Sequence, residues 1–137
     1  MRYLGLDLGT KTLGIALSDK TNTIAHPLKV VRYETNDQLL AELIKIINDK
    51  DIATLVLGLP KNMDNSEGFA VQRSLDFKTF IEQSIALPIV LVDERLTTVQ
   101  AENILLNANM KHQKRKEKID GLAACLILET YLKMKGD

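Results

Sequence analysis

The chain has no tryptophan and only one cysteine among its 137 residues. A single cysteine cannot form an internal disulfide, and Cys125, set in an apolar helical pattern, is expected in the core. With His26 and His112 as the only histidines, there is no ligand set for a zinc site. No apolar run approaches the ~20 residues that cross a bilayer, and the start lacks a signal-peptide pattern. We therefore expect a cytoplasmic protein without a membrane segment.

Net charge and aromatic surface are also lacking. Eighteen acidic residues balance eighteen basic ones, so net charge says nothing about a nucleic-acid partner. Aromatic residues make up 4% of the chain, which leaves little surface for stacking on bases, so base-specific recognition should be weak. Hydrophobic residues at 45% and charged residues at 26% are ordinary globular values. A chain of this length should form one domain over residues 1–137.

Apolar periodicity predicts five strands and four helices. The strands are expected at Arg2–Leu8, Leu13–Ser18, Ile24–Val31, Thr54–Leu59 and Ile89–Val92, and the helices at 35–49, 67–84, 97–107 and 119–135. Short connections make the first three strands an antiparallel meander, and helices link the last two in parallel. Pro27 suits a strand at a sheet edge. The order βββαβαβαα predicts an α/β fold with a five-stranded mixed sheet and helices on both faces.

Three acidic residues occupy positions that this fold could bring together. Asp7 ends the first strand, Glu94 follows the fifth strand, and Asp120 begins the last helix. Ligands of such sheets collect at the carboxyl ends of the parallel strands. Neighbouring carboxylates repel one another unless a cation lies between them, and Mg²⁺ or Mn²⁺ accepts such oxygen ligands. The pattern predicts a divalent-metal site suited to phosphodiester hydrolysis.

Each acid also has a purely structural explanation. Asp7 could accept hydrogen bonds from the amides of its own turn, and Asp120 could stabilise the start of its helix. Glu94 could form an ion pair with Arg95. Asp93 competes with Glu94 as the ligand, but successive strand residues face opposite sides of a sheet. Only one of the two should point into the site, and we favour Glu94.

Basic residues concentrate in segment 111–118, which holds five lysines and arginines and a single acid. We expect this segment to be a mobile arm that closes over a nucleic-acid backbone, although a solvated loop without a ligand is the alternative. Lys11, in the turn after Asp7, and Arg95 are further candidates for phosphate contacts. The candidate substrate-binding residues are Lys11, Arg95, Lys114, Arg115, Lys116 and Lys118.

Four groups of residues resemble the motifs of the YqgF family, also called RuvX, a family of Holliday junction resolvases and pre-16S ribosomal RNA nucleases. The groups are Gly5–Lys11 with Gly14–Ala16, Val56–Pro60 with Asn62–Asp64, Asp93–Thr98, and Lys118 and Asp120 with Ala123–Ala124, Ile127–Leu128 and Tyr131–Leu132. They span nearly the whole chain in order. One departure is Thr12, where the family motif usually continues Lys11 with arginine.

The resemblance implies an RNase H-like fold and a metal-dependent nuclease of the cytoplasm. By matching positions, Asp7, Glu94 and Asp120 become the expected catalytic and metal-binding acids. The expected function is processing of the 5′ end of pre-16S ribosomal RNA, by a monomer or weak homodimer. Two alternatives stay open: a Holliday junction resolvase that acts on DNA, and a non-catalytic nucleic-acid or transcription-associated binding protein.

Overall fold

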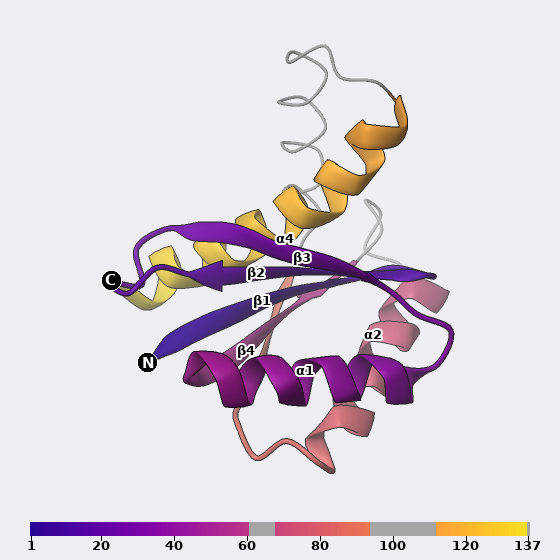
Figure 1. Ribbon diagram of the computed structural model, residues 1–137, viewed down its shortest axis with the longest axis horizontal. Coiled ribbons are helices and arrows are strands. Elements are labelled where there is room, and N and C mark those ends of the chain that lie inside the picture. Colours follow the sequence, from indigo (N-terminus) through magenta and orange to yellow (C-terminus); the bar gives the residue numbers. More distant parts are fainter. Residues whose placement is uncertain (61–67, 94–111, 137) are drawn as a thin grey trace.

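A mixed five-stranded sheet forms the centre of the computed structural model, which describes residues 1–60, 68–93 and 112–136 (Figure 1). The elements are β1 (Arg2–Leu8), β2 (Thr12–Ser18), β3 (Ala25–Arg32), α1 (Asn36–Lys50), β4 (Ile52–Leu59), α2 (Phe69–Glu82), β5 (Ile89–Asp93) and α4 (His112–Gly136). The strand order is β3-β2-β1-β4-β5. β1, β2 and β3 are antiparallel, whereas β4 and β5 run parallel to β1 and to each other. The predicted sheet is confirmed, with Pro27 on an edge strand, and the helix expected at 97–107 lies outside the described residues.

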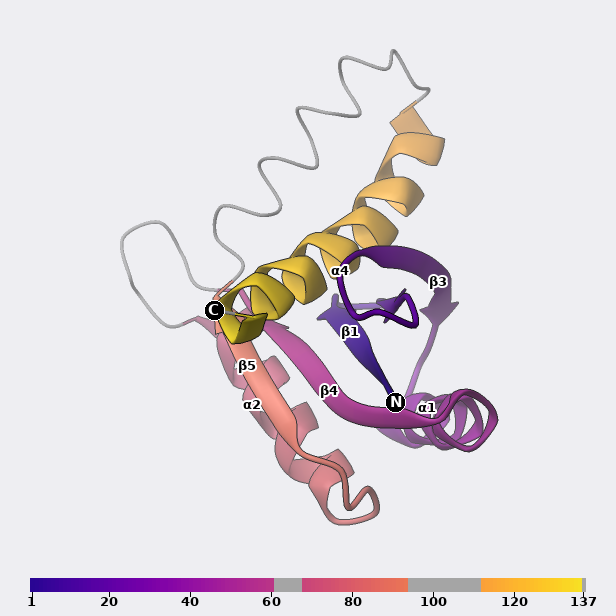
Figure 2. The ribbon, with the colours of Figure 1, turned by 90° about the vertical axis from the view of Figure 1, so that its left-hand side faces the viewer.

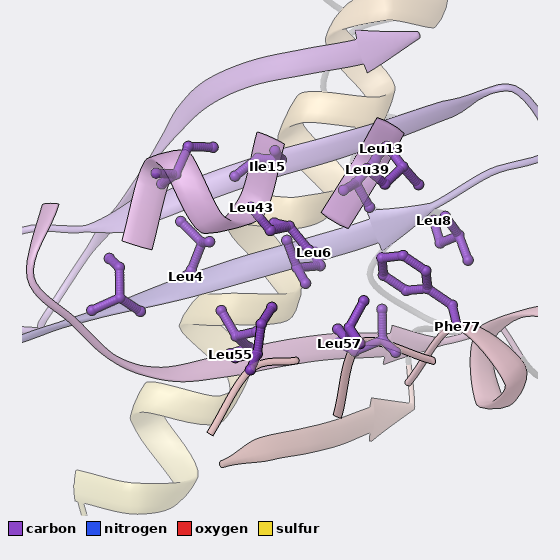
Figure 3. Close-up of a cluster of buried hydrophobic side chains, with 14 residues drawn as sticks. Leu4, Leu6, Leu8, Leu13, Ile15, Leu39, Leu43, Leu55, Leu57 and Phe77 are labelled. Carbon is purple, nitrogen blue, oxygen red and sulfur yellow. The ribbon is translucent and has the colours of Figure 1, made fainter. Parts of the chain in front are cut away.

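The two faces of the sheet are covered by different helices. Figures 1 and 2 show α1 and α2 on one face and α4 on the other. Alternate residues of β1 divide between the faces: Leu4, Leu6 and Leu8 belong to the larger cluster beneath α1 and α2 (Figure 3). Tyr3 belongs to the second cluster, beneath α4. Since side chains alternate along a strand, Asp7 is on the α4 face.

Helix α1 begins as its sequence predicts. Thr35 is the N-cap, and a capping box forms because its side chain accepts a hydrogen bond from the Gln38 amide while the Gln38 side chain reaches back. Its apolar stripe buries Leu39, Leu43 and Ile46 against the sheet. Burying such side chains contributes roughly 1.5–3 kcal/mol each. This helix therefore anchors the face opposite α4.

Helix α4 lies unusually close to the centre of the sheet. A Cβ placed on Gly5 of β1 would lie 2.7 Å from the Ala124 carbonyl oxygen and 2.8 Å from Leu128 Cβ, so only glycine fits here. Further back along β1, the rings of Tyr3 and Tyr131 are 5.8 Å apart. As residue numbers rise along β1, the numbers of the contacting residues on α4 fall. The helix runs antiparallel to the strand that carries Asp7.

The basic segment was predicted to be a mobile arm outside the last helix. This prediction is wrong, because the segment is helical from His112 onward. Residues 112–118 form the first turns of α4, which begins at His112 and not near Ile119. The physical reason is propensity, because lysine, arginine, glutamine and glutamate are good helix formers and no glycine or proline interrupts them. The basic side chains are therefore carried by a continuous helix.

Cys125 of α4 is buried in the cluster between this helix and the sheet, as predicted. Burial, assisted by the nearby Glu129 carboxylate, raises the pKa of its thiol to about 11. The thiol therefore stays protonated and unreactive at neutral pH.

Within the described ranges, no helix has the length and apolar character that a bilayer crossing requires.

Candidate active site

Asp7 lies half-buried near the carboxyl end of β1, in the middle of the sheet. Its antiparallel neighbour on β2 is Gly14. On the other side, the parallel pairing of Leu6 with Leu57 brings Gly58 of β4 next to it. Both lateral neighbours lack side chains. No side chain therefore flanks the carboxylate on the two adjacent strands, and a cation, a water molecule or a phosphate can approach it closely.

The turn of α4 that contains Asp120 lies level with Asp7. Asp7 is two residues beyond Gly5, or about 6.6 Å along the strand. Position 120 is four residues, or about 6 Å along the helix axis, before Ala124 in the matching direction. Gly121 independently supports the placement of this turn beside Asp7, because a Cβ on Gly121 would lie 3.9 Å from Val30 Cγ2 of β3. Val30 pairs with Gly14, which pairs with Asp7, so all three share one row of the sheet.

The structural explanation of Asp120 as a helix-capping residue is wrong. α4 begins at His112, so Asp120 lies more than two turns inside it. The stabilising effect of an acid on the helix dipole is confined to the first turn. A carboxylate at this position therefore needs another reason.

Asp93 and Asp7 lie on opposite faces of the sheet. In β5, Asp93 pairs with Leu59 and Leu91 pairs with Leu57. Leu57 belongs to the cluster beneath α1 and α2, and alternation places Leu59 and Asp93 on that same face. Asp93 therefore cannot share a site with Asp7. Glu94 and Arg95 lie outside the described residues, so the role expected of each stays a prediction.

The turn that follows Asp7 is held by three hydrogen bonds. The Gly9 amide donates to the Thr12 carbonyl at 2.8 Å, and the Tyr33 amide donates to the Lys11 carbonyl at 3.0 Å. The Tyr33 hydroxyl donates to the Gly9 carbonyl at 2.5 Å. This bracing fixes the exposed Lys11 just beyond the end of β1. Arg32 pairs with Thr12 across β2 and β3, so a guanidinium reaches this place from the neighbouring strand.

Replacing Tyr33 by phenylalanine should loosen this turn. The change leaves the half-buried Gly9 carbonyl without its hydroxyl partner, and we expect a loss of about 1 kcal/mol in the free energy of unfolding. Burial raises the pKa of Tyr33, opposed by the nearby Arg73 charge. The hydroxyl's contribution is therefore complete below the ordinary tyrosine pKa and is lost only as the pH rises through the higher folded value. Urea unfolding of both proteins at neutral and strongly alkaline pH measures this, and a gap that is equal at both would contradict the assignment.

The remaining expected site residues are placed only in part. Lys114, Arg115, Lys116 and Lys118 are in the first turns of α4, and the positions of their side chains stay a prediction. Among the described residues, no group of three histidine, cysteine, aspartate or glutamate side chains could hold a metal. Asp7 is the one expected metal ligand whose side chain the structure describes. Sequence reasoning missed Gly58, Tyr33 and Arg32, because only strand pairing brings them to Asp7.

Comparison with known proteins identifies related chains over nearly the full length. Residues 1–134 match the RuvX family, described as a Holliday junction resolvase. A protein of Thermoanaerobacter pseudethanolicus is 42% identical over 133 residues, which are 96% of both chains. A Staphylococcus epidermidis protein is 46% identical over 134 residues, which are 96% of this chain and 94% of the relative. Both carry the name "Putative pre-16S rRNA nuclease".

Two solved resolvase structures share the fold. RuvC of T. thermophilus, in complex with a Holliday junction substrate, has a TM-score of 0.63 at 16% identity and covers 98% of this chain and 96% of its own. The Fowlpox virus resolvase, also bound to junction DNA, has a TM-score of 0.57 at 11% identity and covers both chains completely. At these identities the likeness concerns the fold alone. The fold predicted from the sequence is thereby confirmed.

Proposed function

Because the chain belongs to the RuvX family, we propose that it is a metal-dependent nuclease that hydrolyses phosphodiester bonds in the precursor of 16S ribosomal RNA. The observation that carries the proposal is the position of Asp7, between two glycines and level with the turn of α4 that contains Asp120. Relatives at 42% and 46% identity supply the substrate class. Processing of a ribosomal RNA precursor implies a cytoplasmic location.

The donor set fits a hard divalent cation. Asp7, Glu94 and Asp120 offer only carboxylate oxygens, which Mg²⁺ and Mn²⁺ accept. Asp7 stands on backbone without lateral side chains, which leaves room for a hydrated ion. When bound, the metal supplies an activated water and neutralises charge on the reacting phosphate. The protein's own part is to hold three acids in place and to keep the strand aligned.

Basic residues on two sides of Asp7 align the strand in this proposal. Lys11 projects from the braced turn after β1, and Arg95 follows β5 in the sequence. Lys114, Arg115, Lys116 and Lys118 precede Asp120 on α4, whose first turns extend past the sheet (Figures 1 and 2). Phosphate contacts of this kind position a nucleic acid without specifying its sequence. A single cut in a linear RNA needs one site, so a monomer or weak homodimer suffices.

The proposal is tested by comparing substrates and metals. The purified protein is incubated with end-labelled pre-16S ribosomal RNA, single-stranded RNA and a four-way DNA junction, each with Mg²⁺, Mn²⁺ or EDTA. We expect cleavage of the RNA precursor that needs either metal and stops in EDTA. Cleavage of the junction alone would overturn the RNA assignment in favour of a resolvase. Binding without any metal-dependent cleavage would identify a non-catalytic binding protein.

A further inference from the structure

A polar groove of about 660 Å³ opens beside the turn between β1 and β2. We call it the turn groove, and it is lined by Thr10, Lys11, Arg32, Tyr33, Glu34 and Gln38. Its charged residues are two cations and the single acid Glu34. Lys11 and Arg32 are exposed, and neither forms an ion pair with a residue of the described ranges. The groove thus presents a net positive charge to solvent.

Arg32 relates the turn groove to the face that carries Asp7. Arg32 pairs with Thr12, two residues along the strands from the row that Gly14 forms with Asp7 and Val30. Paired and alternate residues share a face, so Arg32 and Asp7 are on the same side of the sheet. Two strand spacings and two residues along the strand separate their Cα atoms by roughly 12 Å. A nucleic-acid strand that crosses Asp7 toward β3 would pass Arg32 within a few nucleotides.

Both walls of the groove are fixed before any ligand binds. On one side, the Tyr33 amide and hydroxyl hold the turn that carries Lys11. On the other side, the Gln38 side chain accepts hydrogen bonds from the Glu34 amide at 2.6 Å and from the Thr35 amide at 3.3 Å. These polar groups are occupied with the protein's own backbone. Lys11 and Arg32 remain as donors toward a ligand, and the backbone of the turn that carries Lys11 need not be ordered when the ligand binds.

We propose that the turn groove binds a backbone phosphate of the substrate strand, on one side of the bond that is cut, with Lys11 and Arg32 as its two cationic contacts. The identification of the ligand as a nucleic acid rests on the proposed function. Arginine matches phosphate with two parallel hydrogen bonds, and lysine adds a point charge. The groove therefore extends the substrate path from Asp7 across the ends of β2 and β3.

The first test measures how binding depends on salt. The Asp7→Asn chain, with and without Lys11→Gln and Arg32→Gln, is titrated with fluorescein-labelled single-stranded RNA over a series of KCl concentrations. Each phosphate that is no longer neutralised should reduce the slope of log K against log [salt] by about 0.7. Because Lys11 and Arg32 contact the same phosphate in this proposal, we expect the double change to reduce the slope by about 0.7. A matched control removes two exposed lysines elsewhere, Lys20→Gln and Lys45→Gln, and should keep the parental slope. A parental slope in the Lys11/Arg32 variant, or an equal fall in the control, overturns the proposal.

The second test locates the phosphate. RNA substrates carry one neutral methylphosphonate linkage, moved one position at a time away from the cut. We expect one off-cut linkage whose neutralisation weakens binding to the parent but not to the Lys11/Arg32 variant, because the two changes remove the same contact. Full additivity at every linkage would overturn the assignment. These tests measure RNA binding to the Asp7→Asn chain and do not depend on cleavage. Absence of metal-dependent cleavage would therefore contradict the nuclease proposal, whereas unchanged binding by the Lys11/Arg32 variant would contradict the phosphate site in the turn groove.

Discussion

Replacement of Asp7 by asparagine should reduce the kcat for metal-dependent RNA cleavage by more than about a hundredfold. Asparagine keeps the size and shape of the side chain but removes the negative charge and one anionic oxygen. Changes to residues that merely support a metal ligand lower affinity or activity by about 10- to 100-fold, and a direct ligand should matter more. Asp7 stands at the centre of the sheet with glycines on both sides, so no neighbouring side chain on β2 or β4 can substitute. The measurement is cleavage of labelled pre-16S ribosomal RNA at saturating Mg²⁺.

Asp93 provides a matched control for this change. It also ends a strand, but the β4–β5 register places it on the face away from Asp7. We expect Asp93→Asn to cleave at the parental rate, and both variants to keep the parental melting temperature and RNA affinity. Equal cleavage by the Asp7→Asn chain and the parent would remove Asp7 from the site. An equal loss in the Asp93→Asn chain would show that strand-end charge, and not a specific ligand, controls the rate.

Much of this fold follows from period and spacing in the sequence. Leu4, Leu6 and Leu8 alternate with Tyr3 and Asp7, and that alternation alone separates the two faces of β1. The same rule favours Glu94 over Asp93 as a ligand, and the register of β5 confirms that Asp93 faces away. An acid within an apolar strand is visible in the sequence itself, so Asp7 stands out by residue type. Its lateral neighbours do not, because pairing with Gly58 depends on a strand more than forty residues away.

The start of α4 shows where periodicity fails. Residues 112–118 have helical propensity but no apolar stripe, so a method based on periodicity predicts a loop. Arg32 shows a second limit. Regular alternation would place Pro27 and Arg32 on opposite faces, yet a register shift in the β2–β3 pairing puts both on the α4 face. A single extra residue reverses every later side chain in a strand, and nothing in the local sequence marks it.

Alanine at Gly5 should reduce both stability and catalysis. The new Cβ would lie 2.7 Å from the Ala124 carbonyl oxygen and 2.8 Å from Leu128 Cβ. A carbonyl oxygen and a Cβ atom are fixed to the helix backbone, so neither can retreat unless α4 moves. Overpacking of this kind destabilises by about 1–3 kcal/mol. Because α4 also carries Asp120, its displacement changes the position of that residue relative to Asp7. A misplacement of about 1 Å can lower a rate by about a hundredfold, so kcat should fall further than the unfolded fraction explains.

Gly121 on the same helix is the control for Gly5. A Cβ there would lie 3.6 Å from Pro27 Cβ and 3.9 Å from Val30 Cγ2, which is ordinary contact. Alanine is also the better helix former by about 1 kcal/mol, so Gly121→Ala should unfold at the same or higher urea concentration and cleave RNA at the parental rate. If Gly5→Ala is destabilised but cleaves normally when fully folded, the spacing of α4 and β1 does not control the site. A joint loss of stability and catalysis in Gly5→Ala, with neither loss in Gly121→Ala, ties the close approach of α4 to the chemistry at Asp7.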